Sequence, residues 1–584
     1  MIVPMQKLTL LCAAVDRERT VARLAELGVV HVTHLQRLES PQLRAIEHEL
    51  AELERAIQLL PKRSRGSAGT LSAAAIARQV VAADQEARRL RELANKLRAE
   101  RDRIAPLGEF DPQDLETMAA RGLQLRFFRV EERVGLPVLP GVTLREISRA
   151  DGWIHFVTLG AVDRVPGHEV DPPTRRLSEV EADLDATLRD LAAAEATPGR
   201  FAGELQKLQR ARARCRGVVE LARAEAGLRE DGPVACLTGY VPTRAVGLLQ
   251  QESAAQGWAV LCAEPEATDE VPTLVENPRW ARPIESVFHA IGILPGYREA
   301  DVSPVFLIFL SIFFAMLVGD AGYGLLFLGL AWIGRRKLPH IPREVFSLLQ
   351  VMSFATIGWG VLTGTYFGIA ATPGFLVPLR VAWLTNEKNV MLVCFLIGAV
   401  HLTIAHAWAA LRCGRSLQVL AQLGWIATTW TMFLLARTMV LSEPLPGWTL
   451  WLFAGGTALI VCFLTPPRAF RSEWFNHVML PLTLVSNFVD VVSYLRLFAV
   501  GTAGFQVAKA FNEMALAGSG VLAGLTGSLI LFFGHGLNVL LCAMGVLVHG
   551  VRLNTLEFSA HLGIQWTGVP FRPLTQPLAD LERS

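Results

Sequence analysis

Two arginines lie inside long apolar stretches near the end of the chain, where a charge is costly. Arg496 belongs to the segment Asp490-Val-Val-Ser-Tyr-Leu-Arg-Leu-Phe and lies about 20 residues from either end of the apolar stretch 476–514. An arginine at mid-membrane costs from about 2.5 to more than 10 kcal/mol. Asp490 is six residues away, beyond the reach of an i,i+4 pair. We therefore predict a functional role for Arg496, with a structural ion pair as the alternative.

Arg552 is the second such residue and lies in the inner part of the last apolar stretch, 520–558. Snorkelling of this side chain to the membrane face is the alternative to a functional role. Asn538, Gly545 and Arg552 are spaced by seven residues and so share one helix face. A row of polar groups on one face suits a wet path that faces protein, although a single histidine there is more often structural. The candidates for such a path are Asp490, Ser493, His535, Asn538, His549 and Glu557.

The chemistry open to a buried arginine is electrostatic. An arginine keeps its proton at neutral pH, so Arg496 cannot relay protons. It can attract a carboxylate in low-dielectric surroundings, lower the pKa of that carboxylate, and drive off its proton or its bound cation. Because the chain has no repeated helix that carries an obvious partner acid, we expect the carboxylate to come from another chain.

Charge and hydropathy divide the chain near residue 303. After Val302, 16 Lys and Arg stand against 10 Asp and Glu, a net charge of +6, which leaves −4 for 1–302 in a chain of +2. An acidic soluble half argues against a nucleic-acid partner. The eight cysteines show no CxxC spacing and no P-loop motif is present. We therefore predict no metal site, no cofactor and no nucleotide site in this chain.

Apolar stretches, most of them near 20 residues or longer, dominate the second half and qualify as membrane spans. They lie at 304–333, 346–370, 389–411, 419–441, 449–466, 476–514 and 520–558. Basic clusters, which include Arg468, follow the first, third and fifth stretches and place these loops in the cytoplasm. The N-terminus lacks a signal-peptide pattern, so we expect both termini to be cytoplasmic as well.

This orientation requires two short spans within 304–333. The expected turn residues are Gly319, Asp320, Gly322 and Gly324. A single kinked span is the alternative. With two spans the total is about eight, and the last two are too long for a hydrocarbon core of about 30 Å. They must project beyond the membrane or tilt steeply.

The first 302 residues predict α/β lobes and a coiled-coil strut. Strand–helix–strand patterns in 7–35 and 234–262 can join into one lobe, and heptad spacing in 43–60 predicts a paired helix. We predict a cytoplasmic dumbbell, with a compact helical bundle as the alternative. We assign the proximal lobe to 1–40 and 230–270, the coiled coil to 41–110 and 174–228, the distal lobe to about 111–173, and the α-helical polytopic membrane domain to 303–584.

Five segments in order resemble the subunit a/subunit I family of vacuolar- and archaeal-type rotary ATPases. They are 272–278, 318–324, 360–368, 490–499 and 548–558. The resemblance implies a membrane stator subunit in which Arg496 faces a carboxylate on a rotor ring of small hairpin proteolipid subunits, with Arg552 nearby. It implies eight spans, two steeply tilted helices and two offset half-channels. It also implies coiled-coil peripheral stalks that connect the chain to an ATPase head, and a location in a prokaryotic inner membrane.

The chain departs from the eukaryotic members of this family. Cys542 stands where they carry a glutamate, Gly504 where they carry a histidine, and Asp490 replaces another histidine as in prokaryotic relatives. Two other functions stay open. A secondary transporter would favour internal repeats, which we do not find between 346–466 and 476–558. A membrane-anchored coiled-coil scaffold would leave Arg496 unexplained. The sequence leaves both H⁺ and Na⁺ open as the transported ion.

Overall fold

The computed structural model is mostly helical and contains two small sheets. It describes residues 1–33, 41–61, 71–123, 125–137, 142–159, 165–339, 341–369, 374–466, 470–517 and 521–575, so Arg468 and the end of the strand predicted at 29–35 lie outside the described residues. The chain separates into two compact units. One comprises Met1–Gln6, Pro242–Arg244 and Ala263–Arg572, and the other comprises Lys7–Val241, Ala245–Cys262 and Pro573–Ser584.

The two strand–helix–strand patterns build one sheet. The first is β1 (Met5–Ala13), α1 (Arg17–Leu27) and β2 (His31–Thr33); the second is β8 (Val234–Pro242), α7 (Val246–Gln256) and β9 (Ala259–Ala263). The strand order is β2-β8-β1-β9, and β7 (Arg229–Asp231) pairs with β8. Gly28 and Gly257 end the two helices in the left-handed conformation. Leu8, Leu24 and Leu237 are fully or almost fully buried in its core.

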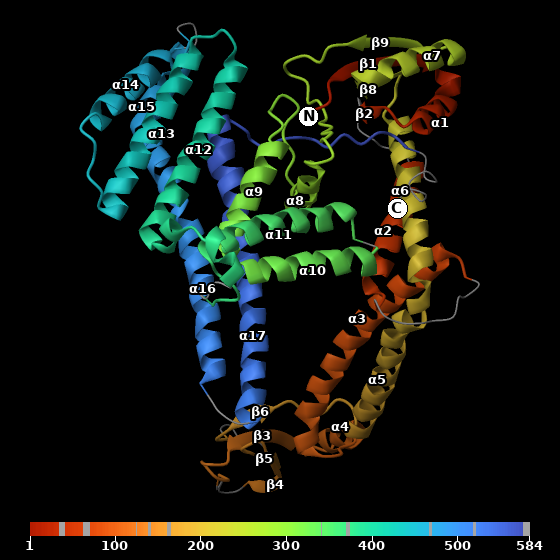
Figure 1. Cartoon of the computed structure of the whole chain (residues 1–584). Coiled ribbons are helices and arrows are strands. Elements are labelled where there is room, and N and C mark those ends of the chain that lie inside the picture. Colours follow the sequence, from red (N-terminus) through yellow and green to blue (C-terminus); the bar gives the residue numbers. More distant parts are fainter. Residues whose placement is uncertain are drawn as a thin grey trace. The chain divides into compact units, whose positions relative to one another are not determined.

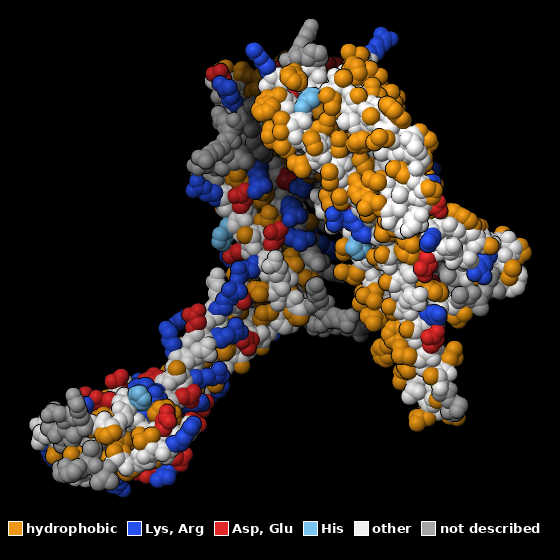
Figure 2. Space-filling model, turned by 90° about the vertical axis from the view of Figure 1, so that its left-hand side faces the viewer, with side chains coloured by type: hydrophobic (Ala, Val, Ile, Leu, Met, Phe, Trp, Pro, Cys, Tyr) orange, Lys and Arg blue, Asp and Glu red, His pale blue; other side chains and the backbone are white. Residues whose placement is uncertain are grey.

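Helices of the same unit pair into an arm. They are α2 (Pro41–Leu59), α3 (Ala73–Ile104), α5 (Leu177–Arg200) and α6 (Leu205–Ala226), and the short helix α4 (Pro112–Ala120) follows α3 in the chain. α2 packs on α6 and α3 packs on α5 (Figure 1). The seams are apolar, with Leu53 and Leu208 in one and Leu97 and Leu184 in the other. Basic and acidic side chains cover the outside of the arm (Figure 2).

A second sheet follows α4 in the chain. It consists of β3 (Leu125–Glu131), β4 (Thr143–Ala150), β5 (Trp153–Leu159) and β6 (His168–Val170). The order is β4-β5-β3-β6, and all its pairings are antiparallel. Phe128 and Phe156 stack face to face in its small core.

The other unit holds the apolar helices. They are α8 (Glu285–Ile291), α9 (Ser303–Val318), α10 (Ala321–Lys337), α11 (Arg343–Thr363), α12 (Glu387–Cys413), α13 (Gln418–Leu441), α14 (Thr449–Phe463), α15 (Phe470–Ser493), α16 (Leu495–Leu516), α17 (Val521–Gly545) and α18 (Ser559–Leu562). Among the described residues, five helices are long and apolar enough to cross a membrane, with α15–α16 and α17–α18 each counted once; α9 and α14 are shorter apolar helices. Exposed hydrophobic side chains cover this region (Figure 2).

The stretch 304–333 contains two helices rather than one kinked helix. Gly319 ends α9 with a φ of 67°, a conformation that favours glycine. The carboxylate of Asp320 caps α10 by accepting hydrogen bonds from the backbone N–H groups of Gly322 and Tyr323 at 2.8 and 3.2 Å. The turn is narrower than predicted, because Gly322 and Gly324 lie within the first turn of α10.

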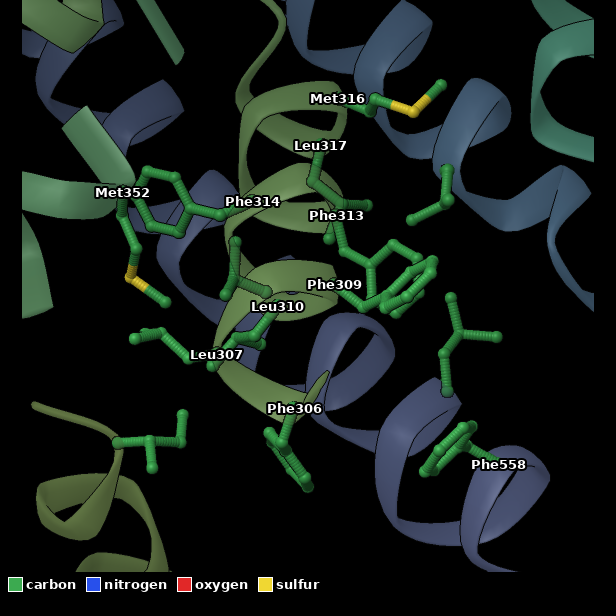
Figure 3. Packing of buried hydrophobic residues seen from close by; sticks show 14 of the residues in the cluster. Phe306, Leu307, Phe309, Leu310, Phe313, Phe314, Met316, Leu317, Met352 and Phe558 are labelled. Atoms are coloured by element: carbon green, nitrogen blue, oxygen red, sulfur yellow. The ribbon is translucent and has the colours of Figure 1, made fainter. Parts of the chain in front are cut away.

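α9 is the central helix of this unit. Its Phe306, Phe313 and Leu317 are fully buried. Figure 3 shows the side chains of α9 pointing toward Met352 of α11 on one side and toward Phe558 of the last helix on the other. In lipid such a core stabilises through close van der Waals packing rather than through exclusion of water.

The two longest helical segments are not regular throughout. α15 and α16 are separated only at Tyr494, and α17 continues into α18 through two π-helical segments, Val546–Gly550 and Leu553–Phe558. A spacing of seven residues no longer equals two turns there, and Asn538 is buried whereas Arg552 is exposed, so the predicted shared face is not continuous. α16 and α17 run side by side, and α10 and α11 run across them (Figure 1).

Candidate functional site

Arg496 lies in the first turn of α16, directly after the helix break at Tyr494. Its Nη2 donates a hydrogen bond to Oε1 of Glu557 at 3.2 Å, and Nε of Arg552 lies 3.6 Å from the same oxygen. One carboxylate therefore serves two guanidinium groups, and the cluster keeps a net positive charge. The π-helical segment that carries Glu557 fits the frequent occurrence of such bulges at functional sites.

The hydrogen-bonding atoms of this cluster are only partly paired among the described residues. The side chain of Glu557 is 4% exposed, against 26% for Arg496 and 53% for Arg552. Among the described residues, neither Nη1 of Arg496 nor Oε2 of Glu557 has a hydrogen-bond partner, and both atoms are buried. Buried polar atoms are rarely left without partners, which sets these two atoms apart from most buried polar groups.

Tyr494 fixes the helix break next to Arg496. The tyrosine is fully buried, and its hydroxyl lies 2.8 Å from Nδ1 of His401 on α12. The imidazole is sandwiched between the rings of Phe309 and Phe558, with centroids 3.9 and 4.4 Å away. Gly398 of α12 lies under the tyrosine ring, because a Cβ there would come within 2.6 Å of that ring.

Asp490 belongs to a chain of four hydrogen-bonding side chains. Its Oδ2 lies 3.0 Å from Nε2 of His561 on α18. Nδ1 of that histidine lies 2.9 Å from Nε2 of His406 on α12, whose Nδ1 lies 2.8 Å from Oε1 of Gln422 on α13. Asp490 was predicted as a site residue, but the two histidines and the glutamine were not.

His535 and Asn538 belong to a separate polar network. The hydroxyl of Tyr323 lies 2.6 Å from Nδ1 of His535 and accepts a hydrogen bond from Nδ2 of Asn538 at 3.0 Å. Nε2 of His535 lies 3.1 Å from Oδ1 of Asn512 on α16. This network joins α10, α16 and α17 at a distance in sequence from the Arg496 cluster.

Asp320 lies beside this network but has a structural role. Besides capping α10, its carboxylate accepts hydrogen bonds from the backbone N–H groups of Phe367 and Gly368 at 2.7 and 2.8 Å. Four backbone donors on one buried carboxylate tie the loop after α11 to the start of α10.

The remaining candidates lie outside these networks. Ser493 donates a hydrogen bond to the carbonyl of Asp490 at 2.7 Å and so stays within its own helix. His549 lines a cavity of about 450 Å³ between α16 and α17, together with Gly504 and Cys542. The structure thus groups Arg496, Arg552 and Glu557 and places Asp490 in the histidine chain. His535 and Asn538 share a different network, and Ser493 and His549 belong to none of these groups.

A second cavity, of about 240 Å³, begins next to Arg496. Residues of α16 from Leu497 to Gln506 line one wall of it. The other walls come from the ends of α9 and α11, the segment before α12, and the start of α12, and they carry polar side chains such as Thr365, Arg380 and Glu387. Arg380 and Glu387 were not predicted, because they lie in the connection between two apolar stretches, and neither was Thr365, near the end of the stretch 346–370.

α12 passes both polar regions. Glu387 at its first residue lines the cavity, His401 contacts Tyr494 near its middle, and His406 belongs to the histidine chain near its end. Nineteen helical residues separate Glu387 from His406, which is about 29 Å at 1.5 Å per residue. Glu387 and His406 thus lie about one hydrocarbon thickness apart, and His401 lies at an intermediate level, in contact with Tyr494, two residues before Arg496.

Buried charge in an apolar helical bundle is typical of polytopic membrane proteins that have a functional site within the membrane. Comparisons with known proteins give the family. The chain is 30% identical to the V-type ATP synthase subunit I 1 of Treponema pallidum, with 99% of this chain and 100% of the relative covered. It is 28% identical to V-type ATP synthase subunit I of Borreliella burgdorferi, with 98% and 99% covered. The chain belongs to the V-type and A-type ATP synthase subunit I family.

Other comparisons cover a smaller part of the chain. The A-type ATP synthase subunit I of Thermococcus kodakarensis is 27% identical over 55% of this chain and 51% of its own length. A crystal structure of the cytoplasmic N-terminal domain of subunit I, a homolog of subunit a, of V-ATPase matches 44% of this chain and 99% of its own, with 15% identity and a TM-score of 0.20. No family model matches the chain. The resemblance predicted from five segments is confirmed, and the chain is a membrane-embedded subunit of a rotary ATPase that works with other subunits.

Proposed function

We propose that this chain is the stator that couples ion flow to rotation, and that Arg496 meets a carboxylate on a rotor ring of small hairpin proteolipid subunits. The observation that carries the proposal is the incomplete pairing of Arg496. Among the described residues, Glu557 is the one ion-pair partner of its guanidinium and its buried Nη1 has no hydrogen-bond partner, while a quarter of its side chain is exposed. A carboxylate that approaches the exposed part draws the guanidinium from Glu557 and supplies the missing acceptor.

The proposed coupling step is electrostatic. A protonated ring acid that reaches Arg496 loses its proton, because the fixed positive charge stabilises the carboxylate. Arg552 adds to the positive charge, and Glu557 offers Arg496 another partner when the ring acid moves on. The guanidinium also repels cations, which hinders an ion from crossing directly between the two sides.

The two polar regions support two offset half-channels. The cavity lined by Glu387 and the chain ending in Gln422 lie at opposite ends of α12, and Arg496 lies at a level between them. An ion that enters one half-channel then reaches the other side only after travelling on the ring. The other expected path residues, His535, Asn538 and His549, belong to neither region.

The same proposal fixes the topology. α9 to α14 provide six spans, and the two long segments α15–α16 and α17–α18 provide two more, with both termini in the cytoplasm. Basic residues Arg335, Arg412 and Arg471 then lie on one side, in accordance with the positive-inside rule. The 44 residues of Glu473–Leu516 extend about 66 Å, so this segment tilts steeply or projects. The membrane is the prokaryotic inner membrane.

The soluble part has a mechanical role in this proposal. The paired helices of the arm act as a coiled-coil strut, and the two lobes hold peripheral stalks that lead to the ATPase head. We retain the boundaries predicted for the proximal lobe, the coiled coil and the distal lobe within 1–302, and for the membrane domain at 303–584.

The test is ATP-driven ion pumping by the assembled complex with Arg496→Ala or Arg496→Lys. We expect both variants to assemble and to lose pumping, because lysine lacks the bidentate geometry of a guanidinium. Lys509→Ala, an exposed cation on the same helix, is the matched control and should pump normally. Normal pumping by Arg496→Ala would refute the assignment.

A further inference from the structure

We propose that Asp490, His561 and His406 form a proton relay on the cytoplasmic side of Arg496, and that the ion carried by this chain is therefore H⁺. The inference rests on the proposed function, since a relay serves only a subunit that moves ions. The chain of side chains crosses four elements, α15, α18, α12 and α13, at distances of 3.0, 2.9 and 2.8 Å.

Each member of the relay is largely shielded from solvent. His406 is buried and its ring lies parallel to that of Trp425, with centroids 6.0 Å apart, while His561 and Asp490 keep small exposed fractions. A buried imidazole pair in hydrogen-bond contact requires that one ring donates and the other accepts. The tautomers of the two histidines are therefore linked to each other and to the groups at both ends.

Two arrangements of the protons on these side chains, which differ in the number of protons, satisfy every contact. In the first, the oxygen of Gln422 faces His406, so this histidine carries its proton on Nδ1 and accepts at Nε2 from Nδ1–H of His561. A further proton lies in the contact between Nε2 of His561 and Oδ2 of Asp490. The relay contains three protons in total.

In the second arrangement the NH₂ group of Gln422 faces Nδ1 of His406, which now accepts. Nε2–H of His406 donates to Nδ1 of His561, and Nε2–H of His561 donates to an ionised Asp490. The relay now contains two protons. The two arrangements differ by a single proton, and the rotation of one amide accommodates the change.

Conversion of the first arrangement into the second moves one proton along the relay. The N–H bond at Nδ1 of His561 breaks as one forms at Nε2 of His406, and the proton on Nδ1 of His406 leaves to water. The proton shared with Asp490 stays on Nε2 of His561. When the third proton of the first arrangement entered at Asp490, this conversion completes the passage of one proton from Asp490 to His406, and the reverse conversion, with uptake at Nδ1 of His406 and release at Asp490, carries one proton the other way. Either passage leaves both histidines in the opposite tautomer, so each ring must return its proton to the starting nitrogen before the next proton passes.

The relay does not suit a sodium ion. Its central contact joins two nitrogen atoms 2.9 Å apart, which leaves no space for a cation between them. Imidazole nitrogen is also a poor ligand for hard cations, which prefer oxygen. Within the described residues, no group of three His, Cys, Asp or Glu side chains is arranged to hold a metal ion.

The position of the relay matches a route that ends at the ring. His406 and Gln422 flank the short connection between α12 and α13, at the ends of these helices. Asp490 lies six residues before Arg496, about 9 Å along the helix. Among the described residues, other titratable or charged groups around the relay are His401 on α12, Tyr494, Glu557 on the last helix, and Arg496.

The experiment uses the whole complex in liposomes, with ATP added outside and the internal pH followed by a dye. For the unmodified complex we expect acidification of the interior in sodium-free buffer, with no stimulation by added sodium. His561→Gln and His406→Gln each keep a hydrogen-bonding side chain of similar reach but cannot exchange protons between two ring nitrogens. We expect each to lower pumping by a factor on the order of 10² while the complex still assembles.

The matched control is His477→Gln, on α15 but outside the relay, which should pump at the normal rate. The solvent isotope effect separates a relay from a structural role. If proton passage becomes limiting in His561→Gln, the ratio of rates in H₂O and D₂O rises, whereas fewer intact complexes would lower both rates equally. An unchanged ratio with a lowered rate overturns the relay.

Two further results overturn the proposal. Pumping that requires sodium in the unmodified complex shows that the ion is not H⁺, and this measurement does not depend on any variant folding. Normal pumping by both histidine variants shows that protons do not pass through the relay. Failure of the stator role is distinguishable, because it shows instead as pumping that persists in Arg496→Ala.

Discussion

The pairing of Arg496 with Glu557 makes a quantitative prediction for Glu557→Gln. In the proposed cycle a ring carboxylate must leave Arg496 at every step, and Glu557 replaces it as the partner. Glutamine keeps the shape and one acceptor oxygen but removes the negative charge. The ring carboxylate is then held more tightly, because the alternative partner 3.2 Å from Nη2 is weaker.

The magnitude follows from the burial of the pair. Removal of one partner from a fully buried ion pair costs about 3–5 kcal/mol. Arg496 keeps a quarter of its side chain exposed and glutamine still accepts a hydrogen bond, so we expect about 2 kcal/mol here. A difference of about 2 kcal/mol corresponds to a release step that is slower by about 30-fold.

The assay is ATP-driven pumping and rotation of the reconstituted complex. Glu513→Gln is the control, because Glu513 is exposed at the other end of α16 and pairs with Lys509 at 3.9 Å, a surface pair of little energetic weight. We expect slow rotation with normal assembly for Glu557→Gln and no change for the control. Rotation at the normal rate by Glu557→Gln would refute the role of Glu557 as an alternating partner.

Three more outcomes follow from the structure. Gly398→Ala places a Cβ within 2.6 Å of the Tyr494 ring, and should lower the thermal stability of the complex by about 1–3 kcal/mol in a thermal-shift assay. Phe309→Ala opens space beside His401, and should let a preformed pH gradient in liposomes decay faster without ATP. Burial and the charge of a nearby arginine lower the pKa of His155 below 6.5, so the unfolded chain takes up a proton before the folded one does; hydrogen exchange in its sheet should therefore show a loss of stability as pH falls below about 6.5.

Much of the architecture follows from local patterns. The strand–helix–strand patterns predicted the elements around α1 and α7, and the charge rule required a break in 304–333 that the structure places at Gly319 and Asp320. These features depend on neighbours in sequence, so the sequence carries them directly. The break at Tyr494 and the π-helical segments could not be predicted, because the apolar run continues through both.

The site was predictable only where one residue is costly by itself. Arg496 stands out because a charge in an apolar stretch is costly. His401 and His406 are also ionisable residues in an apolar stretch, 389–411, but they were not among the predicted site residues. Glu557 was a candidate, but its pairing with Arg496 spans 61 positions and depends on how α16 packs on the last helix. His561 lies beyond the last apolar stretch and gains its significance only from the neighbours that the fold provides.

On the proposed mechanism, the order of groups along α12 lets a single subunit admit ions from both sides without leaking. Between Glu387 at the cavity and His406 in the relay, α12 carries His401, whose imidazole is packed between two phenylalanine rings and hydrogen-bonded to the fully buried Tyr494. Water needs room and several polar partners to occupy such a site, and aromatic packing provides neither. On the proposed mechanism the dry segment closes the direct path while Arg496 repels cations beside it, so the ring carboxylate becomes the remaining carrier, and transport requires rotation.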